Sequence, residues 1–165
     1  MRIVITGNSG SGKTTLARAL ARESALVQLD LDTLAWDAAI PTRRRRLSES
    51  VAALSGFMDE NERWVVEGCY SDLLAGAVAR CTRLVFLNPG IDACIANCRA
   101  RAWEPHKYSS PEAQDANLAM LIEWVRAYET RRDEFSLHSH RALFDAFRGE
   151  KVELSAVLQT SDAMR

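Results

Sequence analysis

Short apolar segments alternate with longer amphipathic segments along the whole chain. Several of the apolar runs are rich in β-branched side chains, which is typical of strands buried on both faces. They span residues 2–6, 26–30, 64–67, 83–87 and 151–154. Short buried strands separated by helices indicate a parallel sheet that is covered by helices on both sides. The pattern therefore predicts a three-layer α/β fold.

The segments between the strands carry apolar residues at the spacings of amphipathic helices. Helices are expected at residues 13–23 and at 42–58, with Thr42 as the N-cap of the second. Another should follow the third strand and end at Ala79, and further helices are expected at 91–100, from Pro111 to about Arg132, and after Ser155. In the second of these helices, Leu47, Val51 and Leu54 would form the face that packs on the sheet. Residues 101–110 are polar and without periodicity, so we expect a loop there.

The composition is that of an ordinary globular protein. The 165 residues are 47% hydrophobic and 26% charged, with a net charge of -1 at pH 7. This length predicts a single domain over residues 1–165, and the balanced charge does not favour a general nucleic-acid-binding surface. The chain opens without a signal-peptide pattern, and no apolar run reaches the roughly 18 residues that a membrane span needs. We therefore expect a cytoplasmic protein with no membrane partner.

One glycine-rich segment matches a phosphate-binding motif in full. The pattern G-x-x-x-x-G-K-[ST] is satisfied by the consecutive residues Gly7, Asn8, Ser9, Gly10, Ser11, Gly12, Lys13 and Thr14. The segment follows a predicted strand and opens a predicted helix, which is the context that this Walker A motif requires. Backbone N–H groups at a helix N-terminus bind phosphate oxygens, and glycines let the loop approach them closely. The segment therefore predicts a P-loop that binds the phosphates of ATP.

Three side chains at the end of this loop have expected roles in nucleotide binding. Lys13 would bridge the β- and γ-phosphates, the Thr14 hydroxyl would be a ligand of Mg²⁺, and Thr15 would reach the α-phosphate. The loop alone does not identify the reaction, because GTPases, ATPase motors, kinases and regulators share it.

Acidic side chains close two of the predicted strands. Asp30 and Asp32 follow the second strand, and Glu67 with Gly68 ends the third. In a doubly wound sheet the carboxyl ends of the strands line the ligand crevice. Asp32 would orient or deprotonate an acceptor hydroxyl, Gly68 would let the acceptor approach the backbone, and Glu67 or Asp30 would support the metal with Thr14. Alternatively, Asp30 or Asp32 only caps the next helix.

The densest charge in the chain is the run Arg43-Arg44-Arg45-Arg46. At the start of a helix these cations would oppose the helix macrodipole, which suggests an anionic partner. Arg43 or Arg44 would bind the phosphate or carboxylate of a small anionic acceptor. A solvated helix start is the simpler alternative. RNA or DNA is disfavoured as a partner, because no aromatic residues interleave with the arginines.

A second group of cations lies in a segment between two predicted helices. Arg99 and Arg101 flank this segment, at about residues 99–112, which we expect to act as a lid. A lid of this kind excludes water, and one of its arginines would neutralise charge on the transferring phosphoryl group. Arg131 and Arg132 on the following helix are weaker candidates for that contact. The alternative is a surface loop with incidental charge.

Two further strings carry a family resemblance. Residues 31–36 read Leu-Asp-Thr-Leu-Ala-Trp, and residues 64–71 read Trp-Val-Val-Glu-Gly-Cys-Tyr-Ser. With the P-loop and the lid, they make the chain similar to the nucleoside monophosphate kinases and shikimate kinases, a group of P-loop small-molecule kinases. The strings most resemble those of bacterial adenylate-kinase-like proteins labelled topology modulation proteins.

The resemblance implies a P-loop NTPase fold with five parallel strands in the order 2-3-1-4-5. It also implies an acceptor-binding region at about residues 32–60 and a lid after the fourth strand. In shikimate kinases, an Asp-x-Asp pair divides its work between magnesium and the acceptor, and Asp30 and Asp32 would do so here.

The sequence thus favours an ATP-dependent, Mg²⁺-using phosphotransferase, or kinase, that acts on a metabolite hydroxyl or a nucleoside monophosphate. An alternative is an ATP-binding regulatory protein with slow ATPase activity that acts on a DNA or protein partner. A GTPase is disfavoured, because no Asn-Lys-x-Asp guanine motif follows the fourth predicted strand.

Overall fold

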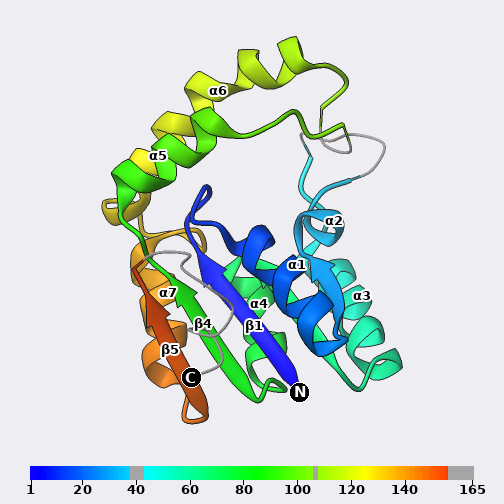
Figure 1. The fold of residues 1–165 in the computed structure, drawn as a ribbon. Coiled ribbons are helices and arrows are strands. Elements are labelled where there is room, and N and C mark those ends of the chain that lie inside the picture. Colours follow the sequence, from blue (N-terminus) through cyan, green and yellow to red (C-terminus); the bar gives the residue numbers. More distant parts are fainter. Residues whose placement is uncertain (38–42, 106–107, 156–165) are drawn as a thin grey trace.

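The centre of the protein is a parallel sheet of five strands in the order β2-β3-β1-β4-β5 (Figure 1). The computed structural model describes residues 1–37, 43–105 and 108–155. The strands are β1 (Arg2–Gly7), β2 (Val27–Asp30), β3 (Trp64–Gly68), β4 (Arg83–Leu87) and β5 (Glu150–Leu154). The α/β fold class predicted from the sequence and the strand order implied by the resemblance are both confirmed.

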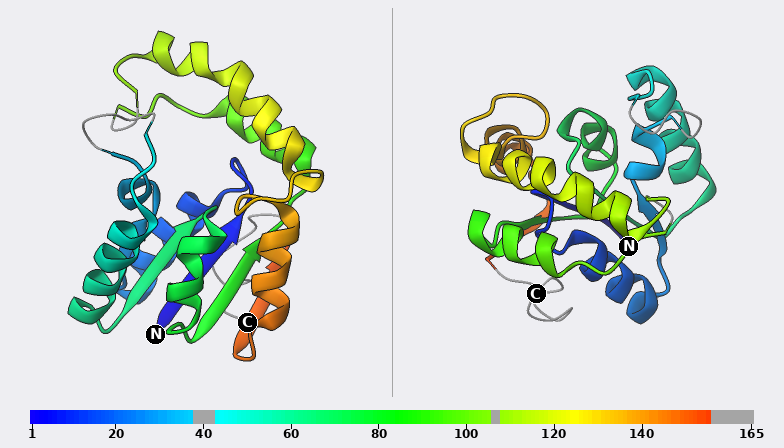
Figure 2. Two further views of the ribbon diagram at one scale, coloured as in Figure 1. Left: turned by 180° about the vertical axis from the view of Figure 1, so that it is seen from behind. Right: turned by 90° about the horizontal axis from the view of Figure 1, so that it is seen from above.

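Helices cover both faces of this sheet, as Figures 1 and 2 show. The helices are α1 (Lys13–Ser24), α2 (Asp32–Ala35), α3 (Leu47–Glu60), α4 (Ser71–Val78), α5 (Ile91–Ala100), α6 (Pro111–Arg126), the 3-10 turn η1 (Ala127–Glu129) and α7 (Leu137–Ala146). Among the described residues, none of these helices has the length and apolar character that crossing a membrane requires.

Alternation along the strands divides the core into two apolar layers. Val4 of β1 packs with residues of α3 and α4, while its neighbours Ile3 and Ile5 pack with residues of α1. Successive strand side chains point to opposite faces of a sheet, so one apolar run supplies both layers. The strands are therefore held in place from both sides, and their carboxyl ends form a fixed edge.

Helices α5 and α6 form a separate arm beyond the carboxyl ends of the strands (Figures 1 and 2). They pack on each other through a third apolar cluster that includes Cys94, Cys98 and Val125. This arm contacts the loop after β1 directly, because Asn97 donates its Nδ2–H to the Gly10 carbonyl at 2.8 Å. Asn8 in turn donates to the Val125 carbonyl at 3.2 Å. The arm therefore helps to hold the glycine-rich loop.

Gly10 is the residue on which this packing depends most. Its φ angle is +77°, in the left-handed region that disfavours a side chain. A Cβ built on it would lie 2.3 Å from the Cys94 carbonyl oxygen and 2.7 Å from the Cys98 sulfur. Only a glycine at this position therefore lets the loop lie this close to α5.

His140 is a buried polar residue that ties α7 to the sheet. Its side chain is 0% exposed, and its Nε2 lies 2.8 Å from the Cys69 carbonyl oxygen. A carbonyl can only accept, so Nε2 carries the proton, and Nδ1 accepts from the Tyr128 hydroxyl at 2.7 Å. Burial lowers the pKa of His140 to about 4 and keeps the ring neutral.

Three local expectations differ from the structure. The helix expected at 42–58 spans Leu47–Glu60. The arginine run therefore precedes the helix instead of forming its first turn, and Arg44 forms an antiparallel bridge with Trp36. Leu47 and Val51, expected to be buried, are 46% and 41% exposed. The buried positions of α3 are Ser50, Leu54 and Met58, and Ser50 is satisfied because its hydroxyl donates to the Leu34 carbonyl.

The remaining differences concern the end of one helix and two helices that were not expected. The helix from Pro111 ends at Arg126 and is followed by a 3-10 turn, short of the expected Arg132. The sequence pattern did not predict α2 or α7. The expected N-cap Thr42 and the helix expected after Ser155 lie outside the described residues.

His140 makes the stability of the protein sensitive to mild acid. Because its pKa is about 4 in the fold and 6.5 ordinarily, only the unfolded chain takes up a proton between these values. The contribution of neutral His140 to stability is therefore fully present above pH 6.5 and is lost as the pH falls towards 4, by up to about 3 kcal/mol. Urea unfolding of His140→Gln, which cannot titrate, should show a smaller decline. In the control His138→Gln, at an exposed position of α7, the free energy of unfolding should change with pH as in the wild type. The same pH dependence in both variants would contradict the role assigned to His140.

Gly10→Ala should destabilise the protein, because the new methyl group meets α5 in a backbone conformation that costs about 1–2 kcal/mol for an L-residue. We expect a total loss of about 2 kcal/mol or more in urea unfolding. The matched control is Gly76→Ala in α4, where a Cβ meets nothing within 4 Å. That change should stabilise the protein by about 0.5–1 kcal/mol. A Gly10→Ala protein as stable as the control would refute this packing.

Candidate active site

A cleft of about 830 Å³ opens between the carboxyl ends of the strands on one side and α5 with the segment after it on the other. Its walls come from the glycine-rich loop and α1, from the ends of β2 and β3, and from the segment after α5. The lining residues are Ser9, Gly10, Gly12, Lys13, Thr14, Thr15, Arg18, Asp30, Asp32, Glu67, Gly68, Cys69, Asn97, Ala100, Arg101, Ala102, Trp103, Glu104 and Pro105. The fold thus brings most of the candidate residues around one space.

The glycine-rich loop wraps the N-terminus of α1. Gly10 and Gly12 both have positive φ angles, +77° and +97°, and α1 begins directly afterwards at Lys13. The Lys13 ammonium group, on a residue that is only 8% exposed, donates to the Asn8 carbonyl at 2.8 Å. Among the described residues, no carboxylate forms an ion pair with it. A largely buried cation at a helix N-terminus, inside a loop of backbone N–H groups, is suited to a polyphosphate.

Thr14 and Glu67 join the loop to the end of β3. The Thr14 hydroxyl donates to Glu67 Oε1 at 2.6 Å, and Glu67 is 2% exposed. Asp30 stands opposite Glu67 in the register of β2 with β3. Burial, and then the nearby Asp30 charge, raises the pKa of Glu67 to about 7 against the opposing effects of Lys13 and Thr14. A cation bound beside Glu67 would stabilise the ionised form of this buried carboxyl group.

Asp32 is tied into position by two contacts. Its backbone N–H donates to Asp30 Oδ1 at 2.9 Å, so Asp30 satisfies a free N–H in the first turn of α2. The Asp32 carboxylate accepts from the Tyr70 hydroxyl at 2.7 Å. Asp30 is not the N-cap of α2, which is Leu31, but its carboxylate holds the first N–H of that helix while it lines the cleft.

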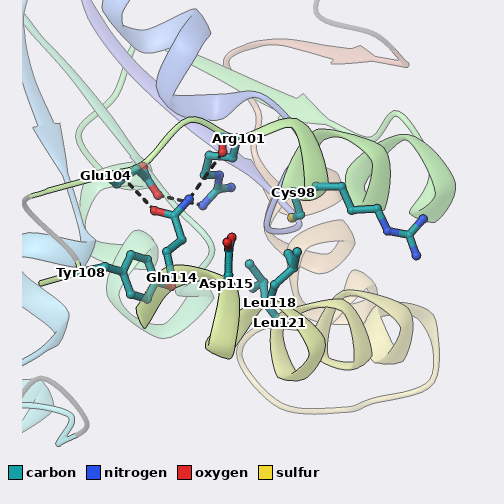
Figure 3. A pocket seen from close by; sticks show the side chains of 9 residues that line it. Cys98, Arg101, Glu104, Tyr108, Gln114, Asp115, Leu118 and Leu121 are labelled. Carbon is teal, nitrogen blue, oxygen red and sulfur yellow. Dashed lines mark hydrogen bonds and ion pairs between the residues drawn. The ribbon is translucent and has the colours of Figure 1, made fainter. Parts of the chain in front are cut away.

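The two lid arginines lie in different surroundings. Arg101 lines the main cleft and forms an ion pair with Glu104 at 3.2 Å. Arg99 does not line that cleft. It lines a small pocket between α5, the following segment and α6, which Arg101 also lines and which Figure 3 shows from close by. In that pocket Gln114 accepts from the Glu104 backbone N–H at 2.9 Å and donates to the Ala102 carbonyl at 3.2 Å. Gln114 thereby fastens the segment to α6.

The arginines expected at the acceptor do not line the main cleft. Arg43 pairs with Asp37, and Arg44 pairs with Asp72 at 2.9 Å and with Glu134. Their guanidinium groups are thus neutralised by carboxylates of the chain itself.

The later pair of candidate arginines also lies away from the lining of this cleft. Arg131 pairs with Asp133 and lies over the Trp124 ring at 3.5 Å. Arg132 is exposed and donates to backbone carbonyls.

Three residues near the cleft were given no role from the sequence. Arg18 lines the cleft one helical turn after Thr14, a spacing that could have indicated it. Asn97 holds the Gly10 carbonyl across 87 residues of sequence, and no local pattern reveals such a contact. Tyr70 belongs to the string 64–71 on which the resemblance rests, but its hydrogen bond to Asp32 spans 38 residues.

The donor set fits magnesium that is shared with a nucleotide. Within residues 1–37, 43–105 and 108–155, no group of three or more His, Cys, Asp or Glu side chains is arranged to hold a metal ion. Magnesium in nucleotide sites is bound by one or two protein oxygens, several waters and the phosphates. The Thr14 hydroxyl and the Glu67 carboxylate supply oxygens of this kind beside the loop.

Comparison with known proteins places the chain in a family. A family model described as an AAA domain matches residues 3–118, whereas no curated protein matches the sequence significantly. A shikimate kinase from Bacteroides thetaiotaomicron is similar in structure, with a TM-score of 0.60 and 18% identity over 99% of this chain and 92% of that one. A gluconokinase from Sinorhizobium meliloti 1021 has a TM-score of 0.55 and 18% identity over 99% and 87% of the two chains.

A sugar kinase from Janibacter sp. HTCC2649 is also similar, with a TM-score of 0.53 and 15% identity over 93% of this chain and 83% of that one. At these identities the likeness concerns the fold. It agrees with the predicted resemblance to P-loop small-molecule kinases. The chain belongs to the AAA domain family, and its fold is that of the P-loop small-molecule kinases.

Proposed function

We propose that the protein is a kinase that transfers the γ-phosphoryl group of Mg·ATP to a hydroxyl or phosphate group of a small acceptor. The observation that carries this proposal is that one cleft joins the phosphate-binding loop to Asp32 and to the carboxylates at the strand ends. Thr14, Glu67 and Asp30 would serve the metal in any P-loop protein, so Asp32 is the carboxylate that favours a kinase over a site that only binds or hydrolyses a nucleotide.

On the donor side, the chain provides binding and charge neutralisation. The N–H groups of the loop and the Lys13 ammonium group would hold the phosphates, and Thr14 with Glu67 would hold magnesium. ATP supplies the phosphoryl group when bound, and magnesium neutralises charge on its phosphates. Asp30, opposite Glu67 in the sheet register, would hold the hydration shell of the metal.

On the acceptor side, Asp32 would orient the acceptor hydroxyl and accept its proton as the oxygen attacks phosphorus and the bond to ADP breaks. Gly68 also lines the cleft, but a Cβ on it would lie 2.9 Å from the Leu31 Cβ, so the space expected there for the acceptor is filled by the core. Arg101 would leave its ion pair with Glu104 and bind the transferring phosphoryl group instead. Positioning and charge neutralisation of this kind account for most of the catalysis of phosphoryl transfer.

The chain acts as one domain in this proposal, with the acceptor region at about residues 32–60 and a lid at about 99–112. Arg99 would join Arg101 only if the lid moves on binding. Arg43 or Arg44 would bind an acceptor anion only by giving up the present ion pairs. Because these two side chains are engaged within the chain, the arginine run gives little support to a regulator of DNA or protein.

The proposal is tested by measuring ADP release from Mg·ATP with purified protein and a panel of acceptors. The panel contains nucleoside monophosphates, sugars, sugar acids and shikimate-like acids. Release that depends on one acceptor class, with the phosphorylated acceptor identified by mass spectrometry, would support a kinase. ADP release that no small molecule stimulates, but that DNA does, would favour the regulatory alternative.

Two substitutions should separate the donor and acceptor sides. Lys13→Ala should abolish turnover, because the phosphates lose their cation. Asp32→Asn should lower turnover by about 100-fold or more while the Kd for Mg·ATP changes less than about twofold. The matched control is Asp59→Asn, which removes an exposed carboxylate of α3 that pairs with Arg80. It should leave both the turnover and the Kd for Mg·ATP unchanged. An equal loss of ATP binding in Asp32→Asn would contradict its acceptor role.

A further inference from the structure

Two distant segments meet in a short chain of hydrogen bonds that ends at Asp32. The Trp36 indole Nε1–H donates to the Tyr70 hydroxyl at 2.6 Å, and the Tyr70 hydroxyl donates to Asp32 Oδ1 at 2.7 Å. We propose that Tyr70 is a positioning residue for phosphoryl transfer, which sets the orientation of the Asp32 carboxylate towards the acceptor. This inference rests on the proposed function of Asp32.

The direction of both hydrogen bonds follows from the groups involved. An indole N–H can only donate, so the Tyr70 oxygen must accept from Trp36. The single hydroxyl proton of Tyr70 is then available to Asp32. Tyr70 is 2% exposed, and burial raises its pKa well above the ordinary value, so the hydroxyl stays protonated. A donor of this kind favours the ionised carboxylate that a proton acceptor needs.

The Tyr70 ring is itself clamped. The Arg44 guanidinium group lies over it, 5.1 Å from the ring centroid, and Phe135 meets it edge-on at 5.3 Å. Arg44 is held in turn by Asp72 and Glu134, which come from two other parts of the chain. The ring therefore has little freedom to swing, and its hydroxyl is kept at one place.

The backbone of Asp32 is fixed from the opposite direction. Its N–H donates to Asp30 Oδ1, so both ends of the residue are held before any acceptor arrives. Tyr70 lies three residues after Glu67, and the turn that carries it leads from β3 into α4. One short segment thus contributes the carboxylate next to Thr14 and the hydroxyl that holds Asp32. Asp32 lines the cleft, and Tyr70 acts through it.

The contact can be tested without knowing the acceptor. In ¹H–¹⁵N spectra of the full chain, the Trp36 indole resonance is assigned with Trp36→Phe. Tyr70→Phe, which keeps the ring, and Asp32→Asn, which removes the charge, should each shift that resonance. Tyr128→Phe removes the hydroxyl that bonds to His140 and should leave it in place. A Trp36 resonance that moves in neither Tyr70→Phe nor Asp32→Asn would overturn the proposal.

The positioning role is tested by kinetics with an acceptor found in the ADP-release screen. Tyr70→Phe should lower kcat about tenfold, the usual size for loss of a hydrogen bond to a charged group. The KM for ATP should change less than about twofold, and Tyr128→Phe should keep the wild-type kcat. In an Asp32→Asn background, Tyr70→Phe should cause no further loss, because the two residues act as a unit.

Two kinetic results would overturn the positioning role. One is an unchanged kcat in Tyr70→Phe, and the other is an equal loss with and without Asp32. If the wild-type protein phosphorylates no acceptor, the proposed function fails and the positioning role fails with it. The Trp36 indole resonance would still show whether Tyr70 holds Asp32. Failure of the proposed function and failure of the Tyr70–Asp32 contact can therefore be told apart.

Discussion

The hydrogen bond from Thr14 to Glu67 is the contact on which the arrangement of the site depends. It joins the first turn of α1 to the end of β3 at 2.6 Å, across 53 residues of sequence. It also places a buried carboxyl group beside Asp30 and near Lys13, where its charge is costly without a cation. The parallel sheet brings these groups to one edge, because the carboxyl ends of all its strands lie on the same side.

Asp32, the residue proposed to bind the acceptor, is held by a second set of contacts. Trp36, Tyr70 and Asp32 form a hydrogen-bonded chain, and Arg44 with its carboxylate partners holds the Tyr70 ring. The contacts around Thr14 and those around Asp32 thus come together in the segment from Glu67 to Tyr70.

The sequence predicted those features that depend on local pattern. Strands β1, β3 and β4 are apolar runs and lie where expected, and the P-loop motif names the residues that surround the start of α1. Helix α7 packs on the core through Leu143 and Phe144, but it was missed because its buried residue, His140, is polar and interrupts that apolar face. The beginning of α3 was misplaced because Arg44 bridges Trp36 and then pairs with Asp72 and Glu134, which lie 28 and 90 residues away. Long-range pairing of this kind leaves no signature in a single sequence.

The most direct test of the account is a calorimetric titration of the purified protein with a non-hydrolysable ATP analogue, in the presence and absence of magnesium. We expect saturable binding at one site per chain, strengthened by magnesium, because loop amides and Lys13 would neutralise the phosphates while Thr14 and Glu67 would supply metal ligands. No detectable binding at millimolar analogue with magnesium would contradict it.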